Sequence, residues 1–129
     1  MTNIKQNDLI QSVADAFQFI SYYHPKDFIS AMGKAYELEQ GAAAKDAIAQ
    51  ILTNSRMCAE GHRPMCQDTG IAVVFLKIGM NVQWGDATMS VTEMVNEGVR
   101  RAYMNPDNPL RASVLTDPAG KRKNTGDNT

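Results

Sequence analysis

The feature that most constrains the fold is an apolar run at residues 71–78, which reads Ile-Ala-Val-Val-Phe-Leu-Lys-Ile. β-Branched residues are frequent in this run, and polar and apolar positions do not alternate along it. A strand with one face in water would alternate, so the run predicts a strand that is buried on both faces. A sheet of this kind must be covered by other elements, which places the chain in the α/β or α+β class.

The sequence before this run predicts helices, because apolar side chains recur there every three or four positions. We expect helical structure over residues 7–58, in three segments, with Asn7 or Asp8 capping the first one. Pro25 suits the first turn of the second segment, and an alanine-rich third segment covers residues 42–57. The expected layout is a set of N-terminal helices packed on a small mixed sheet.

Residues 71–115 predict a strand, a helix and a second strand, in that order. Ser90 and Glu93 match the capping box, in which each side chain satisfies a free backbone N–H of the other residue at the start of a helix. A second, shorter strand is predicted at residues 110–115. Residues 116–129 are polar and rich in turn formers. We therefore expect residues 1–129 to be one truncated portion of a larger domain, or one subunit of a larger protein.

Composition excludes several classes of function. The formal net charge is −1, which gives no electrostatic basis for binding nucleic acid or a membrane surface. The one basic cluster, residues 121–123, reads as a solvated loop or a contact to another subunit. The N-terminus has no secretion signal, and no stretch approaches the roughly 20 apolar residues of a membrane span. We expect a cytoplasmic protein, in which Cys58 and Cys66 are free thiols or metal ligands.

The loop at residues 61–70 carries the chemistry. It has no apolar period, contains Gly, Pro and Asp, and places Cys66, Gln67 and Asp68 side by side before the predicted strand. Cys66 can be a nucleophile or a soft-metal ligand, and an inert buried cysteine is an equally good interpretation of the residue alone. The chain lacks a Cys-x-x-Cys pair, so cysteine alone cannot complete a tetrahedral zinc or cluster site in it.

An alternative interpretation of this loop is an aspartic protease, because Asp68, Thr69 and Gly70 match the Asp-Thr-Gly triplet of those enzymes. The context disagrees with this alternative. Protease triplets resemble the end of an apolar strand, whereas here Cys66 and Gln67 precede the triplet, and several long helical patterns clash with an all-β enzyme. A match of three residues is weak by itself.

The longer string Arg-Pro-Met-Cys-Gln-Asp-Thr-Gly at residues 63–70 resembles the N-terminal motif of the class I, iron–sulfur fumarases and their tartrate dehydratase relatives. Three later segments, in the same order as in that family, are similar to its further markers. They are Met-Val-Asn-Glu-Gly-Val-Arg-Arg-Ala-Tyr at 94–103, Asn-Pro-Leu-Arg-Ala-Ser at 108–113 and Asn-Thr-Gly-Asp-Asn-Thr at 124–129. The resemblance therefore covers nearly the whole chain.

This resemblance implies the N-terminal portion of a fumarate hydratase, which interconverts fumarate and malate at a [4Fe–4S] cluster. Three cysteines hold such a cluster, and its fourth iron binds the substrate. Cys66 matches the first of the three, the other two lie beyond Thr129 in the family, and Cys58 matches none and is interpreted as structural. The resemblance also implies the remainder of the same chain, or a β subunit, as a partner, and a homodimer of the full enzyme. The alternatives are the α subunit of an L-tartrate dehydratase and a non-catalytic interaction module.

Within this resemblance, the motif residues acquire roles. Gln67 is expected to donate a hydrogen bond to the substrate, and Asp68 to orient a base or hold a substrate hydroxyl. Arg111 is expected to bind a substrate carboxylate bidentately, with Arg100 or Arg101 as the replacement candidates. Structural alternatives exist for two of them: Asp68 can cap the turn, and Arg111 can form a surface ion pair. The group that protonates carbon is expected beyond residue 129.

Overall fold

The computed structural model describes the whole chain except residues 118 and 120–123, so the predicted basic cluster lies outside the described residues. The chain forms two compact units. The first contains Met1–Gln18 and Gln67–Thr129, and the second contains Phe19–Cys66. Helices and a small sheet together confirm the predicted mixed class of α and β structure. None of the described helices is both long enough and apolar enough to span a membrane.

The sheet of the first unit consists of two strands of three residues each. Strand β1 (Thr2–Ile4) pairs in parallel with β2 (Val82–Trp84), and Thr2 lies opposite Val82. From the sequence, residues 79–88 predict a connection or a short hairpin, and the structure forms β2 within them; no signal in the sequence predicts β1. Both strands are too short to carry a detectable alternation of polar and apolar residues, which explains why the pattern missed them.

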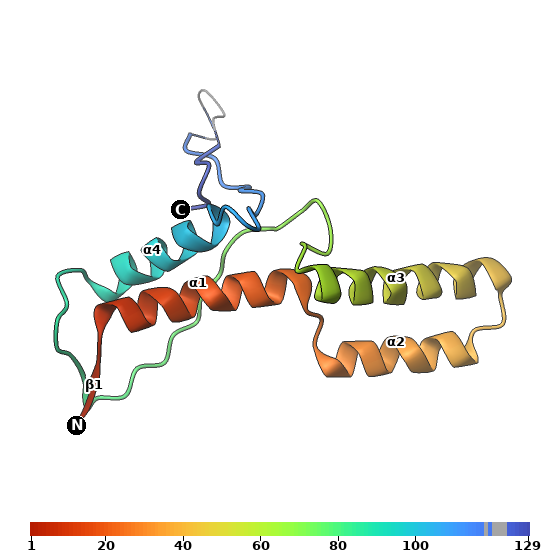
Figure 1. Cartoon of the computed structure of the whole chain (residues 1–129), viewed down its shortest axis with the longest axis horizontal. Helices are drawn as coiled ribbons and strands as arrows, with labels where there is room; N and C mark the ends of the chain where they lie inside the picture. Colours follow the sequence, from red (N-terminus) through yellow and green to blue (C-terminus); the bar gives the residue numbers. More distant parts are fainter. Residues whose placement is uncertain (118, 120–123) are drawn as a thin grey trace. The chain divides into compact units, whose positions relative to one another are not determined.

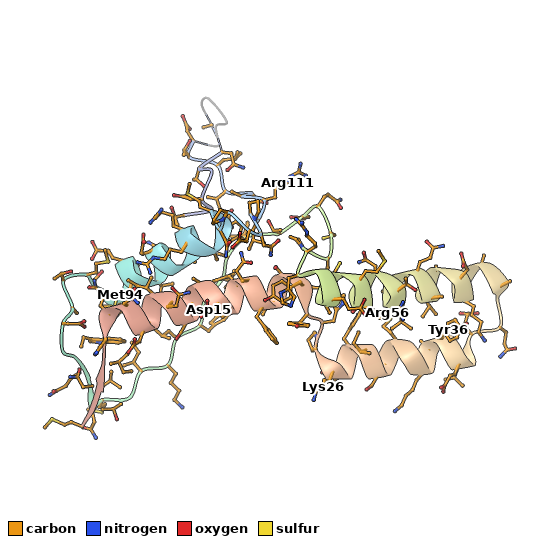
Figure 2. The ribbon with its side chains drawn as sticks, viewed as in Figure 1. Asp15, Lys26, Tyr36, Arg56, Met94 and Arg111 are labelled. Atoms are coloured by element: carbon orange, nitrogen blue, oxygen red, sulfur yellow. The ribbon has the colours of Figure 1, made fainter. Side chains whose placement is uncertain are left out.

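The core of the first unit lies between helix α1 (Gln6–Tyr22) and helix α4 (Val91–Tyr103), which Figure 1 shows lying against each other. The buried side chains that form it are Val13, Ala14, Val99, Ala102, Tyr103 and Leu110. Gly98 permits the close approach of the two helices, because a Cβ atom there would lie 2.6 Å from Cβ of Val13 and 2.7 Å from the carbonyl oxygen of Ile10. Met94, labelled in Figure 2, is 1% exposed on the same helix.

The predicted capping box at the start of α4 is confirmed. The Ser90 hydroxyl accepts a hydrogen bond from the backbone N–H of Glu93, and the Glu93 carboxylate accepts one from the backbone N–H of Ser90 at 2.7 Å. The Glu93 carboxylate accepts hydrogen bonds from the backbone N–H and from the hydroxyl of Ser90, and both lower the pKa of this carboxyl, the backbone N–H contributing most. Helix α1 starts one residue before the predicted range, and Asp86 from the loop after β2 accepts a hydrogen bond from its first N–H, that of Gln6.

The strand predicted at residues 71–78 is wrong. The segment has no strand partner among the described residues, and Phe75 is 95% exposed and Val73 64% exposed. Within this segment only Ala72 packs against the core. An apolar run becomes a buried strand only where neighbouring strands and covering helices surround it, and the described part of the chain supplies neither around Phe75.

The strand predicted at residues 110–115 is also not formed. This segment contributes one isolated antiparallel bridge, between Leu115 and Asn124. Its start is fixed instead by Leu110, which is 7% exposed in the core and whose N–H donates to the carbonyl of Tyr103 at 3.2 Å. The segment is therefore a loop that is anchored at the end of α4.

The second unit is a helical hairpin. Helices α2 (Lys26–Leu38) and α3 (Ala42–Gly61) lie side by side and run in opposite directions (Figure 1). Pro25 occupies the N-cap of α2, one position before the predicted first turn, and α3 extends four residues past the predicted end at Met57. The ammonium group of Lys45 lies 4.9 Å from the ring centroid of Tyr36, which Figure 2 labels on α2.

Candidate functional site at the motif loop

The motif loop begins where α3 ends. His62 caps this helix with a left-handed backbone, φ 47°, and donates its N–H to the carbonyl of Cys58. Its ring stacks on Tyr22 at 4.7 Å between centroids. The sequence analysis assigned no catalytic role to His62, and the structure places it as a helix terminator.

Cys58 and Cys66 differ in their surroundings. Cys58 is buried on α3, where its thiol contacts the side-chain oxygen of Asn54 and the carbonyl of Pro64, both at 3.7 Å. Its place on the preceding helix was predicted. Cys66 is exposed and forms no disulfide. An exposed thiol in a loop is accessible to a ligand or metal, whereas Cys58 fills a packed position.

The residue before Cys66 is held by two hydrogen bonds within the second unit. The N–H of Met65 donates to the carbonyl of Ser21 at 3.0 Å, and the side-chain amide of Asn54 donates to the carbonyl of Met65 at 2.9 Å. Cys66 is the last residue of that unit, and Gln67 is the first residue of the next segment of the first unit. The backbone that leads into the motif is thus fixed immediately before the thiol.

Asp68 caps the turn that follows. One of its carboxylate oxygens accepts the N–H of Gly70 at 2.8 Å, a bond from a side chain to the backbone two residues on, and Gly70 has a φ of 68°. The structural alternative for Asp68 is therefore present in the structure. The side chain is also exposed, so turn capping leaves the carboxylate accessible to solvent.

Arg111, the arginine proposed from the sequence as a ligand of a substrate carboxylate, lies beside the motif. Its guanidinium donates to the carbonyl of Gln67 at 3.4 Å, and its own carbonyl accepts a hydrogen bond from the Thr69 hydroxyl. Figure 2 labels it in the loop after α4. The structure thus brings Gln67, Asp68 and Arg111 together in the first unit, across more than 40 residues of sequence.

The replacement arginines are engaged elsewhere. Arg100 and Arg101 both bind Glu97, at 2.7 Å and 2.9 Å, and Arg101 also donates to the side chain of Asn7 at 3.0 Å. These contacts lower the pKa of Glu97 to about 2, mainly through the hydrogen bond with Arg100. Arg111 forms no ion pair within the described part of the chain, so its surface-pair alternative has no support there.

Two buried polar residues around the motif were not recognised as site residues from the sequence. Tyr103, 3% exposed, donates its hydroxyl to the carbonyl of Thr69 at 3.0 Å. Burial raises the pKa of this hydroxyl, and the charge of Asp68 acts in the same direction, so the hydroxyl stays a donor at neutral pH. The signal that could have found it is that a buried tyrosine needs a partner for its hydroxyl. Asn128, 4% exposed, is the second such residue.

A partly buried pair of side-chain amides holds the loop that leads to Arg111. The side-chain amide of Gln18 donates to the carbonyls of Ala102 at 2.7 Å and Asn108 at 3.0 Å. In return, the side-chain amide of Asn108 donates to the side-chain oxygen of Gln18 at 2.8 Å. Helix α1 therefore positions the turn after α4 that begins the Asn-Pro-Leu-Arg segment.

Comparison with known proteins assigns the chain to a family. Residues 10–129 match the family described as fumarate hydratase (Fumerase). The chain belongs to this family. This fumarase-family chain is 35% identical over 103 residues to a Methanocaldococcus jannaschii protein that carries the provisional name L(+)-tartrate dehydratase subunit alpha, a match covering 80% of the chain and 35% of the relative. It is 28% identical over 123 residues to the L(+)-tartrate dehydratase subunit alpha of Escherichia coli K12, covering 93% of the chain and 39% of the relative.

The matched segments thus span little more than a third of these relatives' lengths. For a fumarase-family chain the implied cofactor is an iron–sulfur cluster. The thiol of Cys66 is suited to be one ligand of such a cluster, because it is exposed and forms no disulfide. Within the described residues, no three His, Cys, Asp or Glu side chains converge in a way that could hold a metal ion. Cys66 accordingly fits the cluster as one of several required thiolates.

Proposed function

We propose that this chain carries part of the active site of a dicarboxylate hydro-lyase, with fumarate and malate as the substrate pair. The observation that carries the proposal is the contact between Arg111 and the carbonyl of Gln67, the residue next to Cys66. Within a fumarase-family sequence, this contact places the guanidinium of Arg111 beside the backbone of Gln67, the residue before Asp68, in the same unit. We further propose that residues 1–129 are the N-terminal portion of the catalytic domain.

In this proposal, Cys66 is one thiolate ligand of a [4Fe–4S] cluster. When bound, a cluster with an open iron site supplies a Lewis acid that polarises the substrate. Arg111 binds a substrate carboxylate through its planar guanidinium, and the amide of Gln67 donates a hydrogen bond to the carboxylate or hydroxyl. Asp68 accepts a hydrogen bond from the substrate hydroxyl while it also caps the turn. Hydration adds a hydroxyl to one carbon and a proton to the other, and none of these three residues is assigned to the proton on carbon.

A second substrate is favoured by the names of the relatives. Both compared proteins are called L(+)-tartrate dehydratase subunit alpha, so the alternative proposal is an α subunit that acts on L-tartrate together with a β subunit. Both reactions eliminate or add water next to a carboxylate, and Arg111 serves either substrate. In the first proposal the partner is the remainder of the same polypeptide and the full enzyme is a homodimer.

The test uses the product of the complete gene, purified without oxygen and assayed in parallel with fumarate, malate and L-tartrate. Turnover of fumarate and malate supports the first proposal, and turnover of L-tartrate alone supports the second.

The variant Arg111→Lys keeps the charge but loses the planar fork, so kcat/KM should fall at least roughly tenfold through a raised KM. The matched control is Arg101→Lys, whose native contacts are to Glu97 and Asn7, and it should leave KM unchanged. Wild-type kinetics in Arg111→Lys would remove this arginine from the site.

A further inference from the structure

Asn128 links two segments of the candidate site, the turn at residues 68–70 and the loop at residues 111–114, which form its two arms. Its side-chain oxygen accepts the N–H groups of Ser113 at 2.7 Å and Val114 at 3.0 Å, two and three residues after Arg111. Its side-chain amide donates to the carbonyl of Gly70 at 3.2 Å, two residues after Asp68. One side chain therefore links the segment that presents Arg111 with the turn that presents Asp68.

The turn at Asp68 is fixed from three directions. Asn128 binds the carbonyl of Gly70, Tyr103 binds the carbonyl of Thr69, and the hydroxyl of Thr69 binds the carbonyl of Arg111. Asn128 also interacts with the hydroxyl of Tyr103. Removing the side chain of Asn128 therefore takes hydrogen bonds away from both arms at once.

The chemistry of asparagine suits this position. Asparagine carries an acceptor and a donor on one short side chain, and both are used here. Its backbone is left-handed, with φ 63°, a conformation that asparagine tolerates better than most residues. Residue 128 is 4% exposed, so water cannot readily replace the lost bonds. An aspartate there would keep the two accepted bonds but would have no donor for Gly70.

We infer that Asn128 is a positioning residue of the dicarboxylate site, which sets the distance between Asp68 and Arg111. The inference rests on the proposed function. Asn128 touches no reacting group, and it acts through the two backbone segments that it joins. Its effect on the reaction should therefore depend on Arg111 being present.

The experiment compares Asn128→Gly and Asn128→Asp in the complete gene product. Glycine keeps the left-handed backbone and removes only the side chain, and aspartate replaces the donor to Gly70 by a carboxylate oxygen that repels the Gly70 carbonyl. Thr129→Ala is the matched control, because Thr129 is the exposed neighbour of Asn128 and its hydroxyl donates to the carboxylate of Asp127 rather than to either arm. For each variant, kcat and KM are measured per folded, cluster-loaded enzyme.

Asn128→Gly should lower kcat/KM by about 10- to 100-fold, the usual effect of losing a partner that orients a site residue. The same change made in an Arg111→Lys background should add less than about threefold, because residues that act as a unit are not additive. Unchanged kcat/KM, or equal losses in both backgrounds, overturns the inference. If the glycine variant does not fold, Asn128→Asp decides the question by the same two criteria.

Amide hydrogen exchange separates this inference from the proposed function. Asn128→Gly should remove protection at the N–H groups of Ser113 and Val114 and also at Gly70, whose N–H is held by Asp68. Thr129→Ala should leave all three protected. A wild-type enzyme without hydro-lyase activity would refute the proposed function, and the exchange pattern would still decide the linkage. Protection lost at 113 and 114 but kept at Gly70 would overturn the linkage.

Discussion

At the scale of single residues, the two cysteines have different predicted fates. Cys66 is exposed in the motif loop, and Cys58 is buried on α3. In the complete gene product, Cys66→Ala should abolish the cluster absorbance together with hydro-lyase activity, because the proposed function makes Cys66 one of three thiolate ligands. Iron content per protein and turnover are the measurements.

Cys58→Ala is the control for that change. It removes a small buried thiol whose contacts are Asn54 and Pro64, so it should lower stability slightly and leave the iron content unchanged. A Cys66→Ala enzyme with normal iron and turnover would refute the assignment of Cys66. Loss of iron in Cys58→Ala, with the fold intact, would mean that the structural interpretation of Cys58 is wrong.

Sequence reasoning selected the motif residues because their types are chemically informative. A cysteine, an amide and a carboxylate side by side predict a site, and in the structure Arg111 contacts the backbone of Gln67 within one unit. It could not find Tyr103, whose position on the apolar face of a helix looks like core in the sequence. The contact between its hydroxyl and the carbonyl of Thr69 joins residues 34 apart, and only the fold reveals such a contact.

At the scale of elements, Gly98 determines how closely α1 and α4 pack. Gly98→Ala should lower the free energy of unfolding by about 1–3 kcal/mol, because its Cβ would overlap Val13 and the carbonyl of Ile10. Chemical denaturation at neutral pH measures the change. Gly33→Ala is the matched control: nothing lies within 4 Å of a Cβ at that position in α2, so it should stabilise by about 0.5–1 kcal/mol. Equal effects of both substitutions would refute the packing argument.

Glu97 makes the stability of α4 depend on pH. Its bonds to Arg100 and Arg101 lower its pKa from 4.5 to about 2 in the folded state. The carboxylate therefore contributes stability above pH 4.5, and this contribution is lost as the pH falls from 4.5 toward 2. The Tm of Glu97→Gln should be lower than that of the wild type above this window, and the difference should shrink within it.

The control is Glu60→Gln, because Glu60 forms an exposed pair with Arg56 at 3.8 Å and such pairs contribute little. Its Tm should follow that of the wild type at every pH. A difference between Glu97→Gln and the wild type that does not change with pH would show that the charge of Glu97 is not the source of the stabilisation.

Helices and strands could be predicted from the sequence where the residues that determine them are close together along the chain. The capping box of α4 was predicted because Ser90 and Glu93 satisfy each other within three residues. The strand predicted at 71–78 is not formed, because a strand needs neighbouring strands to pair with. The apolar pattern indicates only that these side chains favour burial, and it does not say which partner buries them. The strand predicted at 110–115 also lacks a partner strand among the described residues. Its N–H groups at 113 and 114 bind the side chain of Asn128 instead, and the carbonyl of residue 112 binds the side chain of Asn124.

At the scale of the whole molecule, the exposed apolar segment 71–78 determines how the chain behaves alone. Its residues include Phe75 at 95% and Ile71 at 71% exposure, and extended apolar segments of this kind promote association between copies. The apolar composition of residues 71–78 suits burial, and additional polypeptide packed on this segment would provide it. The matched segments leave 65% and 61% of the two relatives' lengths outside them, so both relatives contain further polypeptide.

The 129-residue chain by itself should hold no stable [4Fe–4S] cluster and should show no hydro-lyase activity. A cluster of this type needs three thiolates that converge, and the chain offers one exposed thiol, Cys66, while Cys58 lies buried on α3 with its thiol directed to Asn54 and Pro64. The test is anaerobic reconstitution with iron and sulfide, followed by an iron count and assays with fumarate and L-tartrate. The product of the complete gene, treated in the same way, is the positive control. We expect less than stoichiometric iron, lost on gel filtration, and no turnover from the chain alone. A stoichiometric cluster with turnover would show that this chain supplies every ligand, and the assignment of the remaining thiolates to other polypeptide would be wrong.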